Sequence, residues 1–155
     1  MIAIRQASPD DLDVICEFNT RMAAETEDVV LDPERLREGV RRILNDPDRG
    51  LYFLAETDGR VVAQTSITFE WSDWRNGWFW WLESVYVLPE MRGQGAFRAV
   101  LQHIESLALA AGDVCGIRLY VDGDNQAAAE VYDRLGLPVS RYRMREKDFV
   151  MARDS

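Results

Sequence analysis

The sequence has little histidine and cysteine, and it has no long apolar run. Its 155 residues include one histidine and two cysteines. Cys16 and Cys115 lack metal-ligand spacing, and one histidine without clustered partners is not a ligand set, so we expect no metal site. Both thiols are expected to be buried and free. His103 is expected on the surface, off the apolar face of its helix.

The chain also lacks the signals of export, membrane insertion and nucleic-acid binding. Its longest apolar stretch, near residues 78–82, is far too short to span a bilayer. No apolar core follows a basic start at the N-terminus, so we expect a cytoplasmic protein. A net charge of −9 argues against nucleic acid and anionic membrane surfaces as partners. A cationic substrate is compatible with this charge, and so is simple acidic solubility.

Hydrophobic periodicity predicts the order β-α-α-β-β-β-α-β-α-β within a single domain, residues 1–155. An antiparallel run followed by a β-α-β crossover implies an α/β fold. We expect a mixed, mostly antiparallel central sheet with helices on both faces. Caps and turns place helix starts after Ser8, after Asp32, at Phe97 and after Asn125. The expected strands are 2–6, 51–56, 61–69, 78–88, 116–121 and 138–150.

A strand, a proline and a glycine-rich turn follow one another in residues 82–98. Pro89 ends the strand, and Arg92-Gly93-Gln94-Gly95 opens a long helix. The unpaired N–H groups and positive dipole of a helix N-terminus favour a phosphate there. A P-loop would need a Gly-Lys-Ser/Thr triplet, which the chain lacks. A dinucleotide fingerprint would need a third glycine where Arg98 stands.

Residues 82–101 resemble the coenzyme A-binding motif of the GCN5-related N-acetyltransferase (GNAT) family. That motif places an Arg/Gln-x-x-Gly-x-Gly/Ala turn after a central strand. A second signature, Asn-x-x-Ala-x-x-x-Tyr-x-x-x-Gly-Phe, is matched by Asn125, Ala128, Tyr132 and Gly136-Leu137. The expected element order also agrees with that family. The resemblance implies the acyl-CoA N-acyltransferase fold, with acetyl-CoA as cosubstrate.

The resemblance also implies which residues hold the cofactor. Backbone N–H groups of the turn would bind the pyrophosphate, with help from two arginines. The central strand would pair with the pantetheine arm. Phe97 stands where the family has a small residue, but it keeps its N–H and can begin the apolar stripe of the helix. The implied cofactor residues are Val85, Tyr86, Val87, Arg92, Gly93, Gln94, Gly95, Ala96, Phe97, Arg98, Asn125 and Tyr132.

Two residues are candidates for proton transfer. Glu83 is the only charged residue between Asn76 and Pro89, so we expect a raised pKa that suits a general base. It could instead pair with an arginine or anchor a substrate ammonium. Tyr132 matches the family's general acid, which would protonate the coenzyme A sulfur. It could instead be a packing residue. Direct transfer needs no covalent enzyme intermediate, so neither cysteine has to be a nucleophile. The Val85 N–H could polarise the thioester carbonyl.

The acceptor side is less defined. All five tryptophans fall between Trp71 and Trp81. They could form sheet core and a self-association surface, or an aromatic wall for an ammonium. An acidic segment, residues 25–28, is expected in the loop between the first two helices, where it could attract a cationic acceptor or be merely solvated.

The sequence thus predicts an N-acetyltransferase that acts on a primary amine of a small molecule or a protein, and that could be a homodimer. A sensor or regulatory module that binds acyl-CoA with little turnover is the alternative. An O-acyl or longer-acyl transferase is a third option.

Overall fold

Five strands form one sheet in the order β1-β2-β3-β4-β5 in the computed structural model, which describes residues 1–151. Each of the first four strands is antiparallel to its neighbour, and β5 runs parallel to β4. This mixed, mostly antiparallel sheet confirms the predicted α/β class. The strands are β1 (Ala3–Gln6), β2 (Leu51–Thr57), β3 (Arg60–Ser72), β4 (Gly77–Val87) and β5 (Val114–Arg118).

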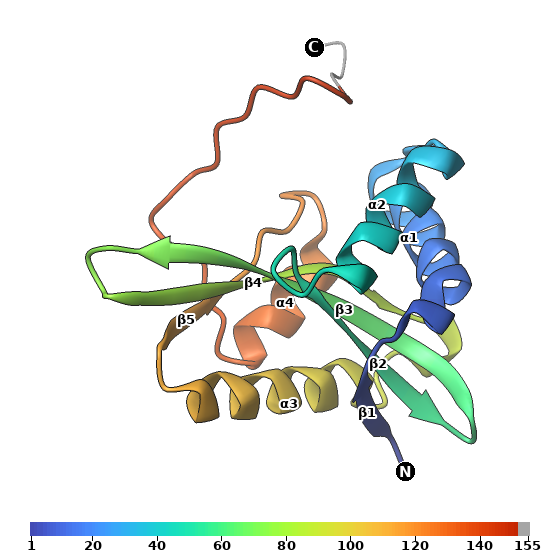
Figure 1. Cartoon of the computed structure of the whole chain (residues 1–155), viewed down its shortest axis with the longest axis horizontal. Helices are drawn as coiled ribbons and strands as arrows, with labels where there is room; N and C mark the ends of the chain where they lie inside the picture. Colours follow the sequence, from blue (N-terminus) through green and yellow to red (C-terminus); the bar gives the residue numbers. More distant parts are fainter. Residues whose placement is uncertain (152–155) are drawn as a thin grey trace.

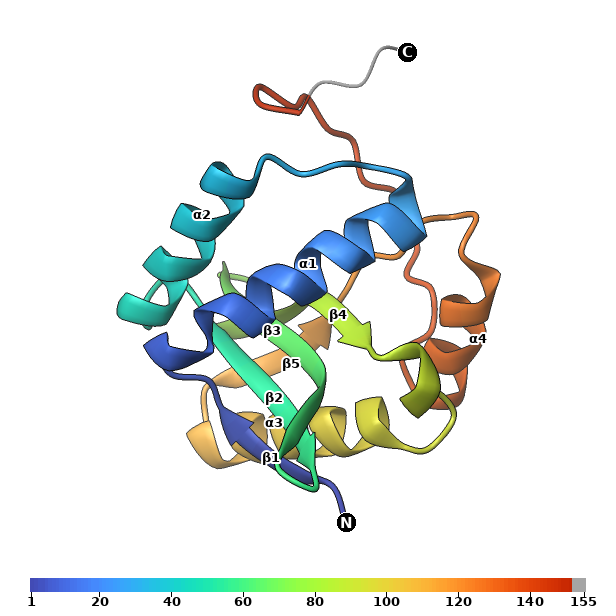
Figure 2. The ribbon, with the colours of Figure 1, turned by 90° about the vertical axis from the view of Figure 1, so that its right-hand side faces the viewer.

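Helices cover both faces of the sheet. The N-terminal pair α1 (Leu12–Glu27) and α2 (Pro33–Asn45) lies on one face, and α3 (Ala96–Ala111) lies on the other (Figures 1 and 2). The last helix, α4 (Gln126–Arg134), follows β5. The predicted start of α2 is confirmed, because the Asp32 side chain accepts hydrogen bonds from the first N–H groups of that helix.

The core has two layers because β2 is apolar on both faces. Phe53 packs in the cluster that includes Val100 and Ile104 of α3. Its neighbours Tyr52 and Leu54 point the other way, into the cluster under α1 and α2. Each large apolar side chain buried in this way contributes roughly 1.5–3 kcal/mol. The two layers together cover both faces of the sheet beneath the site.

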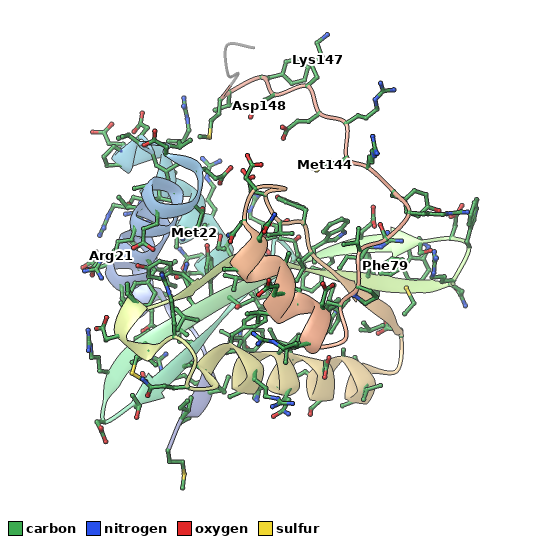
Figure 3. The ribbon with its side chains drawn as sticks, turned by 180° about the vertical axis from the view of Figure 1, so that it is seen from behind. Arg21, Met22, Phe79, Met144, Lys147 and Asp148 are labelled. Carbon is green, nitrogen blue, oxygen red and sulfur yellow. The ribbon has the colours of Figure 1, made fainter. Side chains whose placement is uncertain are left out.

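The prediction of a last strand over residues 138–150 is wrong. Within residues 138–151 the structure contains no strand, and the chain runs along the outside of the molecule (Figure 1). Figure 3 shows Met144, Lys147 and Asp148 along this outlying segment. Alternating polarity indicates which face a strand would bury, but a strand also needs a neighbour that shares its backbone hydrogen bonds. Val139 is 88% exposed, and residues 138–151 pair with no strand in the described part of the chain.

The structure also places the single histidine and the two cysteines differently from the expectation. His103 is partly buried, with its ring edge-on to Phe53 at 5.6 Å, which corrects the expected surface position. His103 lies at the edge of the α3 face that packs against the sheet. Cys16 and Cys115 are free and half-buried rather than fully buried. No helix within residues 1–151 is long and apolar enough to cross a bilayer.

Asp11 joins β1 to the start of α1. Both of its oxygens accept hydrogen bonds from the Arg5 guanidinium, at 2.7 and 2.8 Å, and one also accepts from the Ser8 N–H at 2.8 Å. The side chain of Asp11 is only 11% exposed. The hydrogen bond from Arg5 is the main reason that the pKa of Asp11 falls below its ordinary value of 3.8.

Replacing Asp11 with asparagine is expected to lower the free energy of unfolding by about 1–2 kcal/mol at pH 7. A carboxyl whose pKa is depressed by folding stabilises the protein above its unfolded pKa, and this stabilisation is lost as pH falls through the folded pKa. The difference in unfolding free energy between the parent and Asp11→Asn should therefore become smaller below about pH 4. Urea unfolding at pH 7 and pH 3 measures it, with Asp13→Asn as control because Asp13 is 85% exposed in its pair with Arg37. Equal losses in both variants at pH 7 would contradict the prediction.

Candidate functional site

An open stretch of β4 forms the base of the site. β5 pairs with β4 only between Trp78 and Trp81, so within the described residues the stretch 82–87 has no strand on that side. Its outward-facing backbone groups, apart from the Val87 carbonyl that already accepts a hydrogen bond from Arg92, are available to an extended ligand. Val85 and Val87, which the resemblance assigns to the pantetheine arm, lie in this open stretch. The side chain of Tyr86 instead turns into the core against Phe18, with ring centroids 5.2 Å apart.

The turn after β4 has the form of a phosphate cradle. Gly93 and Gly95 have φ of +77° and +86°, a left-handed region that side chains rarely adopt. Gly95 precedes α3, and no side chain caps the helix there. A Cβ added at either glycine would meet nothing within 4 Å, so the space beside the loop is open. The first N–H groups of α3 are therefore open to an anionic group.

Phe97 behaves as a core residue, as predicted. It packs at the margin of the main core cluster, and its ring meets that of Tyr132 edge-on at 5.7 Å. The aromatic residue at this position thus joins the start of α3 to α4 and leaves the backbone of the cradle intact.

Arg92 is held at the edge of the cradle by the protein itself. Its guanidinium donates to the Val87 carbonyl at 3.0 Å and to Glu25 of α1 at 2.8 Å, and it lies over the Tyr86 ring. The Tyr86 hydroxyl donates to the other oxygen of Glu25 at 2.8 Å. The hydrogen bond from Arg92 is the main cause of the lowered pKa of Glu25.

This contact corrects the interpretation of the acidic segment. Glu25 lies in the last turn of α1 rather than in the following loop, and it binds Arg92 rather than facing solvent alone. Sequence reasoning missed the link because a contact between residues 67 positions apart leaves no local signal.

The other predicted arginine, Arg98, lies further along α3. With Gln102 it lines a shallow cavity of about 140 Å³, which Arg134 at the end of α4 also borders. Arg98 thus faces α4, while Arg92 faces α1. The two arginines do not converge on one point of the cradle.

Asn125 and Tyr132 lie on α4. Asn125 is the N-cap, and its side-chain oxygen accepts a hydrogen bond from the Ala128 N–H at 3.2 Å. The two residues are seven positions apart, nearly two helical turns, so they share one face of α4. Burial raises the pKa of the Tyr132 phenol, and its hydroxyl has no hydrogen-bond partner within residues 1–151.

Glu83 lies half-buried on β4, at the start of the open stretch. Thr68 donates to its carboxylate at 3.3 Å, and no basic side chain within residues 1–151 forms an ion pair with it. Burial raises the pKa of Glu83 above its ordinary value, and the weaker effect of Thr68 opposes this. The alternative of a structural ion pair with an arginine is therefore not found. No hydrogen bond joins Glu83 to Tyr132 in the described chain.

The tryptophans divide between two environments. Trp80 packs against the core near Phe69, whereas Trp74 at the tip of the β3–β4 hairpin is 84% exposed. Trp81 lies near Tyr120, with ring centroids 5.9 Å apart, and Tyr120 is close enough to Glu83 for the carboxylate to help raise its pKa, after burial. Sequence reasoning missed Tyr120, because it follows β5 without any motif.

The described residues contain no group of three or more His, Cys, Asp or Glu side chains placed to hold a metal ion.

Comparison with known proteins decides the family. Residues 15–137 match the model of the acetyltransferase (GNAT) family. The chain belongs to the GNAT family.

Individual relatives agree with this assignment. A possible acetyltransferase from Clostridium difficile 630 is 40% identical, with a TM-score of 0.88 over 97% of this chain and 99% of that one. A structure of a predicted acetyltransferase from Clostridium acetobutylicum with acetyl-CoA has a TM-score of 0.78 over 95% and 96% of the two chains, at 18% identity. Mycothiol acetyltransferase from Streptomyces griseus is 38% identical over 93 residues, 55% of this GNAT chain and 26% of the relative. The chain thus matches only about a quarter of that relative.

Replacing Glu25 with glutamine is expected to strengthen binding of coenzyme A about two- to fivefold at low salt. The substitution frees the Arg92 guanidinium from its counter-charge, and an exposed ion pair of this kind is worth about 0.2–1 kcal/mol. The amide oxygen still accepts from Tyr86. Isothermal titration with coenzyme A measures the effect, and Glu38→Gln on α2 makes the same change in net charge away from the cradle. Unchanged or weaker binding by Glu25→Gln would contradict the prediction.

Proposed function

We propose that this protein transfers the acetyl group of acetyl-CoA to a primary amine. The observation that carries the proposal is that Glu83 is half-buried and has no cationic partner among residues 1–151. It stands on β4 beside an open strand edge that leads into the phosphate cradle. Membership of the GNAT family supports it. The acetyl-CoA in the Clostridium acetobutylicum structure supports the choice of cosubstrate.

The cofactor would lie along β4. The N–H groups of residues 94–97 hold the pyrophosphate, and the backbone of Val85 and Val87 pairs with the pantetheine amides. Arg92 and Arg98 add positive charge at the two sides of the cradle. Asn125 keeps its side-chain NH₂ group available, because only its oxygen is used in the cap. Bound acetyl-CoA supplies an activated thioester at the end of this path.

Three groups of the chain then handle charge and protons. The carboxylate of Glu83 accepts a proton from the substrate ammonium, directly or through a water, so that the nitrogen lone pair can attack. The Val85 N–H donates to the thioester oxygen as negative charge develops there. Tyr132 donates its phenolic proton to the departing sulfur, and its raised pKa keeps the phenol protonated until that step. The second proton, which the nitrogen loses as the amide forms, returns through solvent to the tyrosinate.

The acceptor amine would bind beside aromatic side chains and Glu83. Trp81 and Tyr120 provide a wall beside Glu83, to which a substrate ammonium can bind through cation–π contact. A primary amine on a small molecule or a protein fits this chemistry. The acceptor of the mycothiol enzymes is not carried over, because this chain spans only a quarter of their length.

The experiment that tests the proposal is a panel of amines with acetyl-CoA, in which release of the free thiol is measured. We expect release above the hydrolysis background with at least one primary amine, and an acetylated product by mass spectrometry. Tight binding of acetyl-CoA with no release for any amine would overturn the enzymatic proposal and favour a sensor that binds acyl-CoA.

Replacing Glu83 with glutamine is expected to lower kcat/KM on the order of 100-fold at pH 7, because a neutral amide cannot accept the proton. In the parent, kcat/KM should rise with pH through the raised pKa of Glu83, since only the ionised carboxylate is a base. Glu83→Gln should lack this acidic limb while binding coenzyme A within about twofold of the parent. Glu38→Gln, which makes the same change in net charge, serves as the control. An unchanged acidic limb in Glu83→Gln would assign the base to another group.

A further inference from the structure

A β-bulge interrupts β4 directly after Glu83. Two of its residues, Ser84 and Val85, lie opposite Thr65 alone, between regularly paired residues on either side. Ser84 has φ of +51°, in the left-handed region that non-glycine residues seldom adopt. Such a conformation persists only where the surroundings hold it in place.

Two side chains of β3 hold the carbonyl groups of the bulge. Nε2 of Gln64 donates to the Ser84 carbonyl at 3.1 Å, and Oγ of Ser66 donates to the Glu83 carbonyl at 3.1 Å. In a trans peptide unit the N–H points opposite to the carbonyl of the same unit. The consecutive N–H groups of Ser84 and Val85 therefore both point away from the two β3 side chains.

Gln64 is an unusual residue for the centre of a covered sheet. It is 1% exposed, and its Oε1 atom has no hydrogen-bond partner among the described residues. Burying an unpaired acceptor destabilises a protein, and an apolar side chain of similar size would avoid that cost. The one contact that an apolar side chain could not make is the hydrogen bond from Nε2 to Ser84.

Hydroxyl groups on the same face of the sheet as Gln64 also contact the bulge, because Tyr52 of β2 lies directly opposite Ser66 of β3. The Tyr52 hydroxyl lies 3.5 Å from the Ser84 Oγ, and Asn19 of α1 donates to the same Tyr52 hydroxyl at 3.2 Å. Ser84 is thus held both at its carbonyl and at its side chain.

We propose that Gln64 is a positioning residue for acetyl transfer. Its amide fixes the peptide unit between Ser84 and Val85, so that the Val85 N–H is aimed at the thioester oxygen, with the Ser84 N–H beside it. Two consecutive N–H groups on one side form a concave donor pair of the kind that binds anions. This inference rests on the acetyl transfer proposed above, and it adds a residue on a neighbouring strand that never touches the substrate.

The test compares Gln64→Met with Thr65→Val. Methionine keeps the size of the side chain and removes the donor. Thr65 is the matched control, since it is fully buried and its hydroxyl donates only within β3, to the Gln64 carbonyl at 2.8 Å. Gln64→Met should lower kcat about 10-fold or more, because a misdirected N–H stabilises the transition state less. Its dissociation constant for coenzyme A should stay within about twofold, and Thr65→Val should keep kcat within about twofold.

A second readout does not depend on turnover. In ¹⁵N-labelled protein, the amide resonances of Ser84 and Val85 should shift much more in Gln64→Met than in Thr65→Val, because the Thr65 hydroxyl donates to the Gln64 carbonyl and not to the bulge. Ser66→Ala should shift the Ser84 amide and lower kcat by a smaller factor. If Gln64→Met shows no thermal unfolding transition and is therefore not folded, Ser66→Ala serves as the test variant in its place.

Equal kcat in Gln64→Met and Thr65→Val, with unmoved amides, would overturn the inference. If the parent transfers no acetyl group, the proposed function fails by itself. The amide resonances then decide whether Gln64 orients the bulge.

Discussion

The register shift between β3 and β4 is the constraint on which the site depends. It places two residues of β4 opposite Thr65, sets Ser84 in a left-handed conformation and leaves its carbonyl to the Gln64 side chain. Regular pairing would alternate the N–H groups between the two neighbours of the strand. The bulge instead turns two N–H groups the same way, next to the only carboxylate of the strand.

The end of pairing between β4 and β5 has an equally direct consequence. Beyond Trp81 the two strands separate, and β4 presents an unpaired edge that continues into the glycine turn. An open edge is normally a risk, because it invites pairing with another chain. In the proposed function, this edge and the N–H groups at the start of α3 would together bind a long ligand with amides at one end and phosphates at the other.

Two glutamates show how environment separates chemical roles. Glu25 binds the guanidinium of Arg92, which lowers its pKa and makes it a structural anion between α1 and the cradle. Among residues 1–151, Glu83 has the Thr68 hydroxyl as its hydrogen-bond partner and no cationic partner, so burial raises its pKa above the ordinary value. Both are expected from the same principles of desolvation and charge pairing, but only the three-dimensional contacts distinguish them.

Local patterns in the sequence determined most of the elements. Alternation and periodicity predicted the first five strands and the four helices, and Gly93 and Gly95 predicted the turn because only glycine enters that backbone region freely. The role of Phe97 as a core residue followed from the stripe of its helix. The isolation of Glu83 on an apolar strand was enough to predict its raised pKa.

Tertiary structure decided the rest. It left residues 138–151 outside the sheet, drew Glu25 onto Arg92, brought Tyr120 to Trp81 and placed the amide of Gln64 under the bulge. Each of these depends on a partner far away along the chain. Periodicity encodes which face of an element is buried, but not which distant group will supply its hydrogen bonds or charge, and those partners set the geometry of this site.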